Sequence, residues 1–338
     1  MQIGVRDYID PKVEKYYESY YDVLRTQDFD DKSRLLKPEY GKKILRGPEK
    51  RCRFCGKGGE EATFKKMAHA FPESIGNKTL VSNYECDVCN QYFGNSIEND
   101  YAKFFSLYHS IMQIKGKKGV QKCEFKIPCS KRTPECAAYC IKIFFKEDKP
   151  AICYCKEVNK QYLNLSNNAI TIAQPIAKCS PIAVFKAIVK MAITVMPTEE
   201  LPLFTDAIKW ILESEHKNFY KNRKLLVRYK MIPGFNVTKY PHYILFRRKR
   251  YIWNKPYVLF SLTYGCFSLF VEIPRIGGED NESEFNFMPF PSIPFYTSTK
   301  GFWDLSEIET HKGDRRSITL NFDSIMDYDE NIKTEIPI

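Results

Sequence analysis

Two pairs of cysteines in this chain share the same CxxC spacing. They are Cys52 and Cys55, followed by Gly56, and Cys86 and Cys89. Four thiolates that converge tetrahedrally, each about 2.3 Å from the ion, form the usual structural zinc site. The alternative is four unrelated buried cysteines, but two equally spaced pairs favour a shared metal. We therefore expect one structural zinc ion at this point of the chain.

The residues between and just after these pairs carry groups suited to hydrolysis. His69 lies in the segment Ala-His-Ala-Phe-Pro, Asn83 precedes the second pair, and Asn90 follows it directly. A histidine can accept a proton near neutral pH because its ordinary pKa is about 6.5. Amide oxygens are among the ligands of hard cations. A structural histidine, a turn asparagine and a helix N-cap are the alternative interpretations of these three residues.

The order of these residues resembles the HNH endonuclease superfamily, in the branch whose ββα-metal fold is braced by two zinc-binding CxxC pairs. The resemblance covers about sixty of the 338 residues, and it rests on Cys52, Cys55, the segment around His69, the Gly76–Asn77 turn, Asn83, Cys86, Cys89 and Asn90. It implies that His69 is the general base and that Asn83 holds its imidazole, with Asn77 the less favoured candidate. It also implies that Asn90 ligates one Mg²⁺ or Mn²⁺ ion.

The segment departs from the commonest form of that family at two positions. The residue before the histidine is often an acidic metal ligand in the family, whereas here it is Ala68. One helical turn after Asn90 lies Gly94, which has no side chain. Either the ion is held loosely by Asn90, water and phosphate, or a further residue contributes, for which Glu98 and Glu73 are the candidates. Loss of activity is a third alternative.

Two further groups of residues invite a functional interpretation. Six cysteines could form a second zinc site or be buried in strands: Cys123, Cys129, Cys136, Cys140, Cys153 and Cys155. Basic residues could contact a nucleic-acid backbone: Lys115, Lys117, Lys118, Arg247, Arg248 and Arg250. The three arginines alternate with aromatic residues, which fits such a surface, but a charged edge strand would look the same. The formal net charge of +11 favours a polyanionic partner.

The hydrophobic pattern divides the chain into three parts. Residues 1–48 are expected to form an amphipathic helix over 10–30 and a charged connector. Residues 49–115 form the cysteine module, whose long final helix runs from Phe93 to Ile111 because apolar residues recur every three or four positions. Residues 120–338 form a second domain of unknown role.

This second domain is expected to be α+β with a mainly antiparallel sheet, because its segments alternate between strand-like and helical patterns. The predicted strands are 139–146, 151–157, 225–231, 242–253, 257–264 and 267–273. The predicted helices are 181–196 and 199–214.

These features together predict a metal-dependent endonuclease acting on DNA, most simply double-stranded DNA. A cytoplasmic location is expected, because no signal peptide or membrane-spanning stretch is visible. An activating small molecule or protein partner is a further expectation, and the oligomeric state stays open. By analogy alone, the protein would be a restriction or anti-phage effector. The alternatives are a catalytically silent, zinc-stabilised nucleic-acid-binding or adaptor protein, and an RNase or nickase.

Overall fold

The chain folds into an α+β structure whose sheets are mainly antiparallel, as the sequence predicts. In the computed structural model, the described residues are 11–26, 43–45, 51–120, 123–125, 141–146, 149–154, 163–166, 169–175, 177–220, 223–231, 238–252, 254–275, 299–310, 315–321 and 335–337. Among these, no helix is long and apolar enough to cross a membrane.

The largest sheet has six strands in the order β1-β13-β14-β15-β12-β16, and every neighbouring pair is antiparallel. Their bounds are β1 (Tyr21–Thr26), β12 (Leu226–Met231), β13 (Thr238–Arg248), β14 (Val258–Gly265), β15 (Phe267–Glu272) and β16 (Thr299–Asp304). The central strand β14 is buried along its whole length. Its continuous run of apolar and small polar residues suits a strand covered on both faces.

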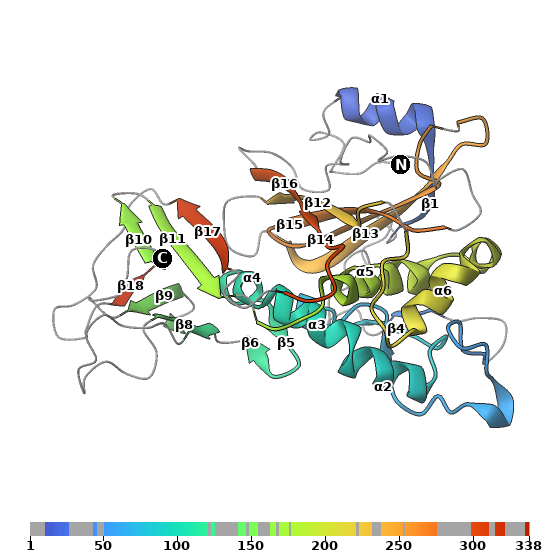
Figure 1. Cartoon of the computed structure of the whole chain (residues 1–338), viewed down its shortest axis with the longest axis horizontal. Coiled ribbons are helices and arrows are strands. Elements are labelled where there is room, and N and C mark those ends of the chain that lie inside the picture. Colours follow the sequence, from blue (N-terminus) through green and yellow to red (C-terminus); the bar gives the residue numbers. More distant parts are fainter. Residues whose placement is uncertain are drawn as a thin grey trace.

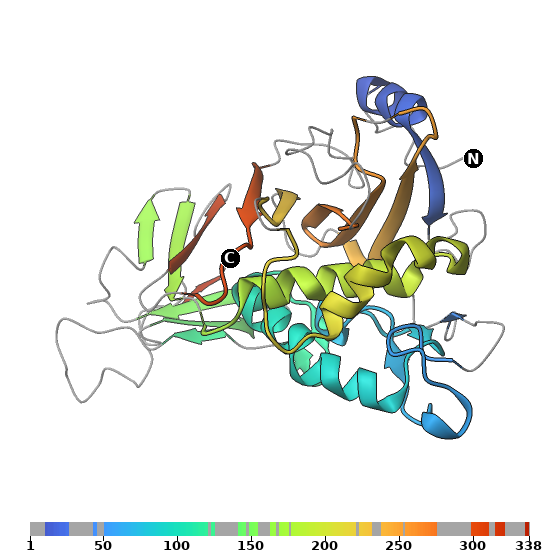
Figure 2. The same cartoon turned by 45° about the vertical axis from the view of Figure 1, so that its right-hand side comes forward.

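One face of this sheet is covered by helix α5 (Pro181–Val195) (Figures 1 and 2). Helix α4 (Ser106–Ile111) also contacts the sheet, because Tyr108 packs edge-on against Phe267 of β15, and helix α3 (Ile97–Phe104) packs against α5. Every residue of α5 is buried, including two lysines, as expected for a helix that packs on all sides. The Ser180 side chain caps its N-terminus by accepting a hydrogen bond from the Ala183 backbone N–H. The 3-10 helix η5 (Thr198–Phe204) and helix α6 (Thr205–Leu212) follow it.

The cysteine module consists of short strands followed by helices. Its strands are β2 (Lys43–Leu45), β3 (Ala68–His69) and β4 (Leu80–Ser82), with 3-10 turns η3 (Gly59–Glu61) and η4 (Glu73–Ile75). The helices are α2 (Asp87–Asn95), α3 (Ile97–Phe104) and α4 (Ser106–Ile111), followed by the hairpin β5 (Lys115–Gly116) and β6 (Gly119–Val120). The single long helix that the sequence predicts is therefore interrupted, first at Ser96 and again at Phe105.

Two smaller sheets lie at the end of the molecule away from α1 (Figure 1). One contains β7 (Cys123–Phe125), β8 (Ile141–Lys146), β9 (Lys149–Tyr154) and β18 (Glu335–Pro337). The other contains β10 (Leu163–Ser166), β11 (Ala169–Pro175) and β17 (Arg315–Asn321). Strands β17 and β18 come from the last forty residues, where the sequence pattern was too weak to predict them.

The N-terminal helix is shorter than the sequence predicts. Helix α1 (Pro11–Tyr20) ends at residue 20, and residues 21–26 form β1, an edge strand paired with β13. The prediction of a helix over 10–30 is therefore wrong for residues 21–26. Tyrosine and valine suit both a helix face and a strand, and pairing with the exposed edge of β13 decides between them.

Candidate active site

Strands β3 and β4 and helix α2 form a ββα unit around the cysteines. His69 on β3 pairs with Val81 on β4 in an antiparallel ladder of two residues. Pro72 follows the strand and starts the turn η4, which Gly76 ends in a left-handed conformation with φ of 87°. Glycine adopts this conformation without steric cost, so the chain can reverse here and return as β4.

The four cysteine sulfurs converge on one point. The Sγ atoms of Cys52, Cys55, Cys86 and Cys89 all lie within 4.8 Å of one another. The Sγ atoms of Cys55 and Cys86 are 3.8 Å apart, which is about the separation expected for two sulfurs of a tetrahedral zinc site with bonds of about 2.3 Å. A hydrogen bond with Cys89 lowers the pKa of Cys52 to about 4, and the same contact raises the pKa of Cys89. A divalent cation would relieve this crowding of thiolates, so the donor set fits zinc.

Asp87, the first residue of α2, fixes the loop that leads into β3. Its carboxylate accepts hydrogen bonds from the Thr63 hydroxyl at 2.5 Å and from the backbone N–H groups of Lys65 and Lys66 at 3.1 and 2.7 Å. The hydrogen bond from Thr63 is the main cause that lowers the pKa of Asp87. The exposed Lys65 and Lys66 are thus held beside the start of α2, a few residues before His69.

His69 is half-buried, and four charged residues lie near enough to affect its pKa. Its Nδ1 atom is buried and has no hydrogen-bond partner among the described residues. Burial lowers the pKa of His69 below its ordinary value; Glu73 and Glu98 oppose this effect, while Lys78 and Lys190 add to it. The imidazole is therefore neutral at physiological pH, which is the form that can accept a proton.

The two asparagines that the sequence offers for bracing the site lie in different surroundings. Asn77 is fully buried: its Nδ2 donates to the carbonyls of Phe71 and Leu80 at 2.8 and 2.9 Å, and its Oδ1 accepts from the N–H groups of Thr79 and Leu80 at 3.3 and 3.0 Å. Asn83 is exposed, and its backbone N–H binds the Leu45 carbonyl. Asn77 therefore ties together the loop between β3 and β4.

Asn90 lies in the first turn of α2 and is half-buried, in the place that the resemblance gives it. Ala68, beside His69, is buried and offers no ligand. Gly94 opens onto free space, since nothing lies within 4 Å of where a Cβ would be. Glu98 on α3 is near enough to His69 to affect its pKa, but its carboxylate binds Lys190.

A catalytic cation would thus have few protein ligands. Among the described residues, the four cysteines are the single convergent group of His, Cys, Asp and Glu. With water and substrate phosphate, the amide oxygen of Asn90 would form a donor set of hard oxygens. Such a donor set fits Mg²⁺, which keeps several waters when bound.

The two predicted basic groups differ in their surroundings. Lys115, Lys117 and Lys118 are exposed on the hairpin of β5 and β6. This hairpin contacts η4, and Lys78 of the β3–β4 loop donates to the Gly116 carbonyl at 2.7 Å. The lysines are therefore next to the ββα unit.

The arginines on β13 and after it are mostly used inside the fold. Arg247 forms an ion pair with Glu200 at 2.8 Å. Arg248 is 6% exposed and donates to the Lys255 carbonyl. Arg250 is exposed. Four of the cysteines considered for a second zinc site lie outside the described residues: Cys129, Cys136, Cys140 and Cys155. The side chains of Cys123 and Cys153 lie outside the described part as well.

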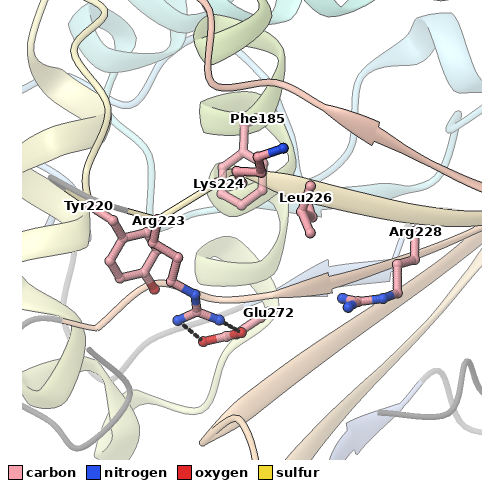
Figure 3. Close-up of a pocket in the computed structure, with 7 residues that line it drawn as sticks. All are labelled: Phe185, Tyr220, Arg223, Lys224, Leu226, Arg228 and Glu272. Atoms are coloured by element: carbon pink, nitrogen blue, oxygen red, sulfur yellow. Dashed lines mark hydrogen bonds and ion pairs between the residues drawn. The ribbon is translucent and has the colours of Figure 1, made fainter. Parts of the chain in front are cut away.

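A separate small hollow lies between α5 and β12 (Figure 3). Its lining residues are Phe185, Tyr220, Arg223, Lys224, Leu226, Arg228 and Glu272. Arg223 and Glu272 form an ion pair with two hydrogen bonds across it. None of the lining residues belongs to the ββα unit, so this hollow is distinct from the candidate active site.

Comparison with known proteins identifies the family of this unit. Residues 52–106 match the family model of the HNH endonucleases, which confirms the resemblance seen in the sequence. No curated protein and no solved structure matches the chain. The match includes the four cysteines, His69 and Asn90, and it ends within α4.

Proposed function

We propose that this protein is a metal-dependent endonuclease that hydrolyses phosphodiester bonds in DNA, with His69 as its general base. The observation that carries this proposal is the position of His69 on β3 of a zinc-compatible ββα unit that matches the HNH endonucleases. A neutral, half-buried imidazole can remove a proton from an attacking water molecule.

The surrounding residues take supporting roles. Asn90 would hold one Mg²⁺ or Mn²⁺ ion, which when bound neutralises charge on the scissile phosphate and on the leaving oxygen. We assign the bracing role to the buried Asn77 in preference to the exposed Asn83, because its four hydrogen bonds hold the loop next to His69.

Exposed lysines around this unit provide a surface for the substrate backbone. They are Lys65, Lys66, Lys115, Lys117 and Lys118. Contacts to phosphates carry no sequence information, so we expect cleavage with little sequence preference. Arg247 and Arg248, which the sequence offered for the same purpose, are engaged by Glu200 and Lys255, and the proposal does not need them.

A plasmid assay tests the proposal. Wild-type protein should cut supercoiled double-stranded DNA with Mg²⁺ or Mn²⁺, and His69→Ala should lower the rate on the order of 10²- to 10⁴-fold. His216→Ala replaces another half-buried histidine, far from this unit in sequence, and should cut like wild type. Wild-type protein that leaves DNA intact with either ion contradicts the proposal. Parallel reactions with single-stranded DNA and RNA identify the substrate.

A second candidate is a zinc-stabilised protein that binds nucleic acid without cutting it. The absence of ligand side chains at Ala68 and Gly94 favours this candidate. It predicts DNA binding by wild-type protein, unchanged in His69→Ala, with no cleavage. A role as a restriction or anti-phage effector, with a small-molecule or protein activator, remains an analogy on either alternative.

A further inference from the structure

Lys190 is a fully buried lysine of helix α5, in the part of the chain that follows the cysteine module. Its Nζ lies 2.9 Å from Oε1 of Glu98, 3.0 Å from Oε2 of Glu85 and 3.4 Å from the backbone carbonyl oxygen of His69. The ammonium donates hydrogen bonds to Glu98 and to the His69 carbonyl, and it forms a buried ion pair with Glu85. All three acidic or carbonyl partners belong to the cysteine module, residues 49–115.

These three partners come from different parts of the cysteine module. His69 lies on β3, Glu85 lies between β4 and α2, and Glu98 lies on α3. Although burial of Lys190 disfavours its charge, the two carboxylates outweigh that effect and raise its pKa. The ammonium is therefore charged, and one buried cation joins the strand that carries the imidazole to the chain on both sides of α2.

A second cation, on the half-buried Arg53 of the cysteine module, binds the same helix. Arg53, inside the first CxxC pair, donates to the carbonyls of Ile193, Thr194 and Met196 at 2.7, 2.9 and 2.7 Å. These carbonyls are at the C-terminal end of α5, where a cation is stabilised by the helix dipole. Lys190 of α5 thus binds the module, and Arg53 of the module binds the end of α5, so these two contacts together hold Lys190 in place relative to His69.

We propose that Lys190 is a positioning residue of the nuclease centre, holding the backbone of His69 and the start of α3 in the arrangement that cleavage requires. This inference rests on the proposed nuclease function. It makes α5 a part of the active-site scaffold, although α5 lies about seventy residues beyond the segment that matches the HNH endonucleases.

The test compares two buried lysines one helical turn apart. Lys186→Met is the control, because the Lys186 ammonium is also buried in α5 but donates to the carbonyls of Glu213 and Glu215. The test variant combines Lys190→Met with Glu85→Gln, so that no fully buried carboxylate loses its charge partner. Glu85→Gln alone isolates the contribution of the second change.

Two measurements decide the outcome. The first is cleavage kinetics: kcat of the Lys190→Met, Glu85→Gln protein should fall on the order of 10- to 100-fold with little change in KM, because small misplacements of catalytic groups have effects of this size. Lys186→Met should keep kcat within about threefold of wild type, even if both variants lose similar thermal stability.

The second measurement does not require activity. In protein labelled at histidine, the ring signals of His69, assigned by their loss in His69→Ala, should shift in the Lys190 variant and stay in place in Lys186→Met. Equal kcat and equal His69 signals in the two variants would overturn the proposal. If wild-type protein does not cut DNA, the proposed function fails, and an unshifted His69 signal in the Lys190 variant would still overturn the positioning role.

Discussion

At the scale of single residues, Asn77 and Asn83 differ in what their side chains hold. Sequence order favoured Asn83 because it lies just before the second cysteine pair, yet its side chain is exposed. Asn77 follows Gly76, and this Gly-Asn pair looks like an ordinary turn. Its four hydrogen bonds depend on how the whole loop folds back, which spacing alone does not reveal.

Replacing these asparagines separates the two roles. Asn77→Ala removes the side-chain partner of the Phe71 carbonyl and of the Thr79 and Leu80 N–H groups in a buried loop, which should lower the free energy of unfolding by about 2–4 kcal/mol and impair cleavage. Asn83→Ala should change it by less than about 0.5 kcal/mol, as is usual for exposed residues. Urea unfolding and plasmid cleavage measure both. If Asn83→Ala lowered stability and cleavage more than Asn77→Ala, Asn83 would be the bracing residue, as the resemblance implies.

At the scale of elements, the cysteine pairs hold the short strands against helix α2. Strand β3 has two residues and β4 has three, too few to be stable without support. The paired CxxC spacing predicts this element correctly, because zinc geometry restricts where four thiolates can lie. The paired spacing could not predict the breaks in the long helix at Ser96 and Phe105, since apolar periodicity continues through both.

Metal analysis tests directly whether the four cysteines bind one zinc ion. We expect roughly one zinc ion per chain, and Cys89→Ser should reduce the zinc content and the melting temperature together. Cys179→Ala is the matched control, because Cys179 is an equally buried cysteine outside the cluster. Its zinc content should stay at the wild-type value. Full zinc occupancy in Cys89→Ser would show that the four sulfurs do not share an ion.

At the scale of the whole molecule, one hydrophobic core joins the cysteine module to the residues that follow it. The core includes Phe93 and Tyr101 of the module, Ile188 of α5 and Leu262 of the large sheet. The sequence predicts α5, β12, β14 and β15 closely, because α5 has a clear apolar stripe and the strands are rich in aromatic and β-branched residues. The prediction for β13 is 242–253, whereas the strand is Thr238–Arg248. The sequence does not predict that the two parts share a core, nor that the buried Lys190 of α5 joins them.

Desolvation of two histidines, the buried His109 and the half-buried His242, predicts acid sensitivity. Burial lowers the pKa of His109 to about 3 and that of His242 to about 4. Below the ordinary value of about 6.5 the unfolded chain binds protons that the folded protein does not, so stability falls as pH decreases. Burial raises the pKa of Glu85 to about 7, and its protonation offsets one of the two histidines.

The expected net loss of unfolding free energy is roughly 1 kcal/mol per pH unit between pH 6 and pH 5. Urea unfolding at pH 7, 6 and 5 measures this loss. Stability that stays constant or rises over this range would mean that these imidazoles accept protons in the folded protein.

The central claim is that the imidazole of His69 accepts a proton during DNA cleavage, and chemical rescue tests this most directly. His69→Gly removes the imidazole and leaves space for an added one. We predict that this variant does not cut plasmid DNA in Mg²⁺ or Mn²⁺ alone, and that added imidazole restores cleavage in proportion to its neutral form. His69→Gly protein that cuts at the wild-type rate without imidazole would contradict the account.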